Sequence, residues 1–198
     1  FYMPVFGKRI NILRLYQAED SAEAEKISEY LYPADDTEEG KILRLRQEYF
    51  FTAAACRDIV QNFVRLHGTN FKNLGKYNTI QLNDTHPVLA IAELIRIMTA
   101  EYAVSFKAAL DAVKGTFAYT NHTILPEALE CWDMGMIERI LPEIAQIISK
   151  IDGAARIERE KAGYSAAEIE ETAVIRGDKA HMANLAVYAS KSVNGVAK

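Results

Sequence analysis

The sequence predicts an α/β fold in which helices outnumber strands. Two short β-rich runs, around Ile80 and at 116–119, alternate with helical runs at 87–99 and 104–115, as they do in a parallel sheet. A chain of 198 residues with 49% hydrophobic content can also bury roughly 70% of its unfolded surface. We therefore expect a single domain over residues 1–198.

Three elements precede the first of these strands. Residues 8–15 alternate polar and apolar side chains as a half-buried strand does, and 21–32 begin with an N-cap residue and an acidic first turn. An acidic loop at 33–40 follows. Apolar residues then recur at helical spacing over 41–67 until Gly68, which predicts a long helix that forms the central strut of the domain.

The C-terminal part of the sequence is mostly helical in pattern. Pro126 suits the first turn of a helix, where its missing N–H would be unpaired anyway, and further helices are predicted at 133–140 and 142–151. Ser165 caps a short helix, and small and apolar residues at 179–190 predict a last one. The fold class is therefore α/β with helices in excess.

Composition argues against several classes of partner. A net charge of −4, with basic residues scattered among more numerous carboxylates, argues against nucleic acid. No apolar run has the length of a membrane span, so no membrane contact is expected. Cys56 and Cys131 lack CxxC spacing and are predicted to be buried thiols. Because no signal peptide is apparent either, we expect a cytoplasmic protein.

Polar residues follow both predicted strands at the point where each strand ends. The first strand leads to Asn83, Asp84 and His86, and the second leads to His122 and Thr123. Ligands of open α/β sheets bind beyond the carboxyl ends of the strands, and this mixture of donors and acceptors suits sugar hydroxyls. The alternative is that these residues only form turns and cap neighbouring helices.

The sequence offers recognition chemistry rather than a self-contained catalyst. It has no HExxH or CxxC spacing, so no metal site is expected, and it has neither a GxSxG elbow nor a P-loop. Removing one buried hydrogen-bonding partner costs about 1–3 kcal/mol, so a few polar side chains suffice to orient a sugar ring.

Four runs of the chain resemble the glycogen and maltodextrin (α-glucan) phosphorylase family, bacterial type. They are LYPADDTEEGKILRLRQEYFFTAA, NTIQLNDTHPVLAIAELIRIM, AYTNHTILPEALECW and SVNGVAK, in this order. The resemblance covers most of the chain but only an interior piece of the family's N-terminal domain. It implies a helix-rich Rossmann-like domain from the N-terminal half of a two-domain glycosyltransferase-B fold.

The resemblance also implies an activity for the full-length protein. The family cleaves α-1,4-glucan with phosphate to release glucose 1-phosphate, using pyridoxal phosphate, and homodimers are expected. The cofactor lysine and the phosphate-gripping residues belong to segments not found in this chain. We therefore expect no cofactor in this piece and no phosphorolytic activity when it is alone.

Several site residues are carried over from the family by their position in the matching runs. His122 matches the active-site histidine, whose side chain meets the sugar 6-hydroxyl and whose carbonyl lies near the anomeric carbon. Asp84 and His86 match residues that line the glucan subsites, with Asn83 and Thr123 beside them. Replacing Asp84 by Ala is therefore expected to act mainly on oligosaccharide affinity.

The remaining matches lie around the acidic loop and the predicted helix at Pro126. Glu127 matches an acidic residue close behind the site, although a carboxylate is favourable in a helix first turn without any substrate. Tyr32, Asp36 and Arg44 match the mobile loop that gates the site and the arginine at its base. Arg44 could instead simply pair with Asp35, Asp36 or Glu48.

The sequence leaves other interpretations open. A non-catalytic carbohydrate-binding or scaffold domain with the same fold is the main alternative. A transferase that uses a nucleotide sugar fits the NDTHP and TNHTILPEALE runs less well. Between Asp20 and Ser21 the family has a longer stretch, which includes most of its dimer-forming tower helix, so homodimerisation is less strongly implied here.

Overall fold

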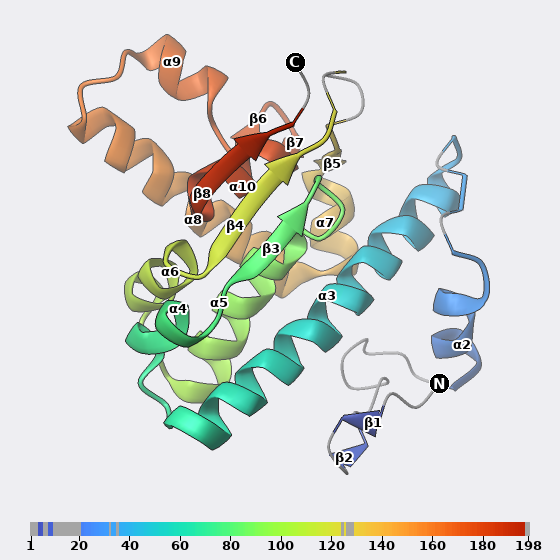
Figure 1. Cartoon of the computed structure of the whole chain (residues 1–198). Helices are drawn as coiled ribbons and strands as arrows, with labels where there is room; N and C mark the ends of the chain where they lie inside the picture. The colour runs from blue at the N-terminus through green and yellow to red at the C-terminus, as the bar shows by residue number, and fades with distance from the viewer. Residues whose placement is uncertain are drawn as a thin grey trace.

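The computed structural model describes residues 4–5, 8–9, 21–31, 33–34, 36–123, 125 and 129–196. Its central sheet has three parallel strands in the order β3-β4-β8, formed by Ile80–Asn83, Phe117–Asn121 and Ser190–Gly195 (Figure 1). The predicted parallel pairing of the first two strands is thereby confirmed. Because all three strands end at the same edge, the residues that follow β3 and β4 are neighbours in space.

Helices pack behind this sheet and beside it. Figure 1 shows α5 behind the strands, α6 beside the start of β4 and α3 along the β3 side. The helices of the described residues are α2 (Ser21–Glu29), α3 (Glu38–His67), the 3₁₀ helix η1 (Phe71–Asn73), α4 (Leu74–Tyr77), α5 (Leu89–Tyr102), α6 (Phe106–Lys114), α7 (Met134–Ile140), α8 (Pro142–Lys161), α9 (Ala166–Glu171) and α10 (Met182–Ala189). None of them combines the length and the apolar character that crossing a membrane requires.

Helix α3 is the central strut that the apolar spacing predicted, and it begins slightly earlier than expected, at Glu38. The Thr37 side chain caps it by accepting the N–H of Gly40 at 3.0 Å. It ends at Gly68, whose φ of 72° suits a residue without a Cβ. The last residues of the predicted acidic loop thus belong to the helix, and α3 packs against α5.

A second, antiparallel sheet corrects part of the prediction. It has the order β5-β7-β6, formed by Cys131–Asp133, Lys179–His181 and Ile175–Arg176. The helical prediction after Pro126, which itself lies outside the described residues, is wrong for β5. Residues 179–190 likewise divide into β7, α10 and the first residue of β8 rather than one helix. The reason is tertiary pairing, since Trp132 lies opposite Ala180 and both are buried.

The N-terminal elements bear out two expectations in part. β1 (Pro4–Val5) and β2 (Lys8–Arg9) pair antiparallel, and the rest of the strand predicted over 8–15 lies outside the described residues. The predicted helix at 21–32 is α2, which ends at Glu29. It docks by its C-terminal end, because the Gln47 side chain of α3 donates to the carbonyl of Ile27 at 2.7 Å.

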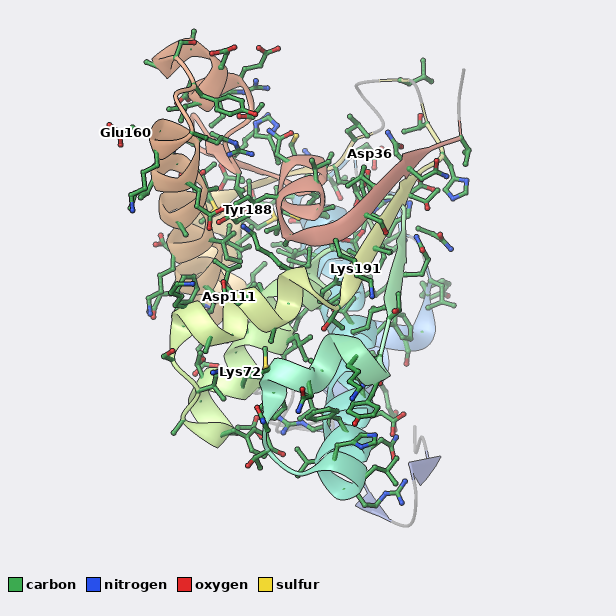
Figure 2. The ribbon with its side chains drawn as sticks, turned by 60° about the vertical axis from the view of Figure 1, so that its left-hand side comes forward. Asp36, Lys72, Asp111, Glu160, Tyr188 and Lys191 are labelled. Atoms are coloured by element: carbon green, nitrogen blue, oxygen red, sulfur yellow. The ribbon has the colours of Figure 1, made fainter. Side chains whose placement is uncertain are left out.

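The core tolerates one fully buried carboxylate because that carboxylate is paired. Glu93 of α5 accepts from Arg96 Nε at 2.7 Å, from Arg96 Nη2 at 2.8 Å and from the Tyr49 hydroxyl at 3.0 Å. Tyr188 of α10 lies close to α8, and the Lys114 ammonium is 3.8 Å from its ring centroid (Figure 2).

The two cysteines differ in their surroundings. Cys56 is buried and its Sγ lies 3.5 Å from the carbonyl oxygen of Ala90, as a buried thiol should. The same prediction is wrong for Cys131, which is exposed because it occupies an outward position on β5. Its Sγ lies 3.2 Å from Nδ1 of His181.

Candidate functional site

The exit of β3 is a sharp turn built around Asp84. Asn83 ends the strand with an exposed side chain, and Asp84 follows with a φ of 57°. Aspartate is among the few residues that tolerate this left-handed conformation. The Asp84 N–H donates to the carbonyl of Thr120 at 2.8 Å, so the turn stays attached to β4.

The exit of β4 is a polar turn held by its own side chains. Asn121 Oδ1 accepts the N–H of Thr123 at 3.0 Å, and Thr123 Oγ1 accepts the N–H of Leu125 at 3.2 Å. Between them His122 exposes its side chain, and its N–H donates to Asp84 Oδ1 at 2.7 Å. The two strand exits thus meet, as their common edge predicted.

Beside these exits lies a charged cluster formed by Arg44, Glu48, His86 and Glu130. Glu130 Oε1 is 3.0 Å from Arg44 Nη2 and 2.8 Å from His86 Nδ1. Glu48 Oε1 is 3.4 Å from Arg44 Nε and 3.8 Å from His86 Nδ1. The cluster therefore joins α3, the turn after β3 and the segment that leads into β5.

Mutual charge and burial set the protonation of this cluster. Burial, together with the neighbouring charge of Glu130, raises the pKa of Glu48 well above its usual value. Hydrogen bonding to Glu48 and the charge of Glu130 raise the pKa of His86 to about 9, against the effect of burial. For Glu130 burial is outweighed by hydrogen bonds from Glu48 and His86, so its pKa lies below the usual value. His86 is accordingly protonated at neutral pH.

A cavity of about 450 Å³ opens next to the charged cluster. Apolar and polar side chains both line it, and the lining residues are Leu31, Arg44, Gln47, Glu48, Phe51, Thr52, Asn83, His86 and Pro87. An apolar wall with a few converging polar groups is typical of a small-molecule site. The cavity connects Arg44 at the start of α3 with Asn83 at the end of β3.

The structure brings most of the residues that the sequence singled out into two groups, and only the second of them lines the cavity. Asp84 and His122 are bonded to each other, with Thr123 in the same turn. Arg44, Asn83 and His86 line the cavity. Asp36 is exposed on the loop before α3, and no contact that the structure gives it within the described residues reaches the charged cluster. Tyr32 and Glu127 lie outside the described residues.

Sequence reasoning missed Glu130 as a member of the site and treated Glu48 only as a possible partner of Arg44. Glu48 lies one helical turn from Arg44, a spacing at which opposite charges on a helix can pair. Glu130 closes the TNHTILPEALE run, but nothing in its spacing showed that it reaches back to α3 and His86.

The charged cluster has the donor types of a metal site, but the raised pKa values of Glu48 and His86 favour the protonated forms, which do not bind a metal. Ligand atoms of Glu48, His86 and Glu130 lie within 4.8 Å of one another. The guanidinium of Arg44 occupies the position of the counter-charge, since it contacts both carboxylates. The positive charge of Arg44 would repel a divalent ion, so the described residues do not favour a metal there.

An α/β domain with polar side chains gathered at the carboxyl ends of its parallel strands is the class that the fold and the site define. The family model described as carbohydrate phosphorylase matches residues 8–198. The chain therefore belongs to the carbohydrate phosphorylase family.

Curated relatives support the same assignment. The chain is 40% identical to glycogen phosphorylase of Bacillus subtilis, an alignment that covers 99% of the chain and 26% of the relative. It is 41% identical to the liver form of human glycogen phosphorylase, over 88% of the chain and 22% of the relative. A Vicia faba α-1,4 glucan phosphorylase L isozyme is 45% identical over 68% of the chain and 14% of the relative. The chain thus spans about a quarter or less of these relatives' length.

Proposed function

We propose that the chain is the sugar-facing part of the N-terminal domain of an α-1,4-glucan phosphorylase. In this proposal the longer enzyme has the two-domain glycosyltransferase-B architecture and uses phosphate to release glucose 1-phosphate from glycogen or maltodextrin. The observation that carries the proposal is the direct bond between the two polar strand exits, from the His122 N–H to Asp84 Oδ1 at 2.7 Å. It gathers donors and acceptors at the edge where α/β domains bind ligands.

The proposed roles follow from the chemistry of glycoside cleavage. The reacting sugar passes through an oxocarbenium-like state, which places positive charge on the anomeric carbon. His122 meets the ring through its side chain and offers its carbonyl dipole to that charge. Asn83, His86 and Thr123 hold hydroxyls of the glucan, and Asp84 lies on the same wall.

The acidic loop is proposed to gate this wall. Arg44 holds the base of the loop, because its guanidinium contacts Glu130 at 3.0 Å and its helix begins at Glu38, within the last residues of the loop. Asp36 is exposed on that loop and free to approach a ligand. Tyr32 and Glu127 keep the substrate-binding roles that the sequence predicts.

The cofactor is proposed to lie outside this part of the enzyme. Pyridoxal phosphate would supply acid and base chemistry through its phosphate in the longer protein. A lysine that holds such a cofactor is enclosed, whereas every lysine of the described residues with an assigned side chain is exposed or half-buried. The described residues therefore do not fit the cofactor. A homodimer in the cytoplasm is the proposed setting of the longer enzyme.

Two assays test this function. The protein encoded by the reading frame that contains this chain should release glucose 1-phosphate from glycogen and phosphate, with pyridoxal phosphate bound. The 198-residue chain should not do so under the same conditions. A longer protein that binds maltoheptaose but releases no glucose 1-phosphate would instead support a non-catalytic carbohydrate-binding domain. Release by the short chain at an enzymatic rate would contradict the proposed division of labour.

A further inference from the structure

The peptide unit between Asn121 and His122 is fixed at both ends. Its N–H donates to Asp84 Oδ1 at 2.7 Å, on the β3 side. Its carbonyl, from Asn121, accepts the N–H of Val196 at 3.1 Å, on the β8 side. Because the N–H and C=O of a trans peptide point in opposite directions, the two bonds together fix the orientation of the peptide plane between Asn121 and His122.

Asp84 adopts a left-handed backbone conformation, which directs its carboxylate toward the His122 N–H. A residue other than glycine rarely adopts a φ of 57°; aspartate tolerates it better than most, and the conformation persists where the surroundings hold it. Here the Asp84 N–H is held by the Thr120 carbonyl at 2.8 Å, so the turn places the carboxylate beside β4 instead of along β3. Bonds from a backbone N–H to a carboxylate are stronger than those between neutral groups.

We infer that Asp84 is a positioning residue, whose carboxylate holds the His122 peptide in place for the reacting sugar. The expected effect on turnover rests on the proposed function, whereas the bond between the Asp84 carboxylate and the His122 amide does not. It also changes the expectation for the substitution of Asp84. A residue that only bound glucan would affect affinity, whereas a residue that orients His122 should affect kcat.

Three substitutions separate the carboxylate's bond from the backbone conformation. Asp84→Asn keeps an acceptor and tolerates a positive φ, so it should preserve the His122 bond. Asp84→Gly keeps the conformation but removes the acceptor. Asp84→Ala removes both, and is expected to destabilise the turn as well.

Amide hydrogen exchange, followed by NMR in the 198-residue chain, reads the bond directly. The His122 amide should exchange about 10- to 100-fold faster in Asp84→Gly than in the wild type, and within about threefold of it in Asp84→Asn. The amide of residue 84 is the internal control, because its bond to Thr120 should survive in both variants. An unchanged His122 rate in Asp84→Gly, with that control still protected, would overturn the inference.

Kinetics of the longer enzyme test the consequence for catalysis. Asp84→Gly should lower kcat at least tenfold with a smaller change in KM, and Asp84→Asn should restore most of the loss. A raised KM with kcat unchanged would show a glucan ligand instead and refute positioning. If His122→Ala leaves kcat unchanged, the proposed role of His122 fails, whatever the exchange rates show.

Discussion

Replacing Glu130 by Ala should destabilise the fold by about 2–3 kcal/mol. The Glu130 side chain is 12% exposed and accepts from Arg44, which is 20% exposed, and from His86, which is 45% exposed. Removing one partner of a buried ion pair costs roughly 3–5 kcal/mol, because the other charge is left uncompensated. Two features of the charged cluster reduce this cost: His86 can be hydrated, and Glu48 remains 3.4 Å from Arg44.

Urea denaturation of the chain measures this free energy of unfolding. The single tryptophan, Trp132, is buried two positions from Glu130 and should report the transition by its fluorescence. The matched control is Asp111→Ala, which removes the exposed ion pair with Lys107 at 2.7 Å. Side chains that are 84% and 59% exposed should contribute at most about 0.5 kcal/mol.

A double-mutant cycle with Arg44→Met isolates the pair itself. The interaction energy between Glu130 and Arg44 should lie in the range of about 1–3 kcal/mol, since the two side chains are in direct contact. If Glu130→Ala is no more destabilising than Asp111→Ala, or if the two substitutions add without coupling, the charged cluster does not hold these segments together.

Three further predictions concern protonation, the buried carboxylate and the thiols. Burial raises the pKa of Glu48 above its usual value, so folding favours its protonated form. The contribution of Glu48 to the free energy of unfolding is therefore fully present below about pH 4.5 and declines as the pH rises. Glu48→Gln should therefore lose less stability than the wild type between pH 4.5 and 8, and an identical slope in urea titrations would disprove this. Arg96→Met leaves Glu93 without its charge partner inside the core and should cost about 3–5 kcal/mol, whereas a cost below about 1 kcal/mol would show that Glu93 takes up a proton cheaply. In the folded chain iodoacetamide should modify the exposed Cys131 and spare the buried Cys56. Mass spectrometry of the digested protein measures this difference. Modification of Cys131 should be slow, because partial burial raises the pKa of its thiol.

Local signals in the sequence were sufficient where the chain follows its own periodicity. Helical spacing identified α3, and Ser165 caps α9 through a capping box, as its position before an acidic stretch indicated. The pairing of β3 with β4 followed from the alternation of strand and helix. These features depend on contacts within a few turns of chain, so composition and spacing report them directly.

Other elements depend on partners distant in sequence and were therefore missed. β5 pairs with β7, which is some fifty positions further along the chain, and β8 completes the central sheet beside β4. Their side chains give weak strand signals, and hydrogen bonding to the neighbouring strand decides their conformation. The helix predicted across 179–190 failed for this reason.

The candidate site shows the same division. The sequence by itself determined which residues follow the strand ends, and hence that His122, Asp84 and His86 lie at one edge of the sheet, because parallel strands share that edge. Only the tertiary structure decided that the Asp84 carboxylate binds the His122 amide and that Glu130 reaches Arg44 and His86. Such contacts depend on the φ angle at a single turn and on the path of a connecting segment. Residue types and their spacing do not reveal either of these.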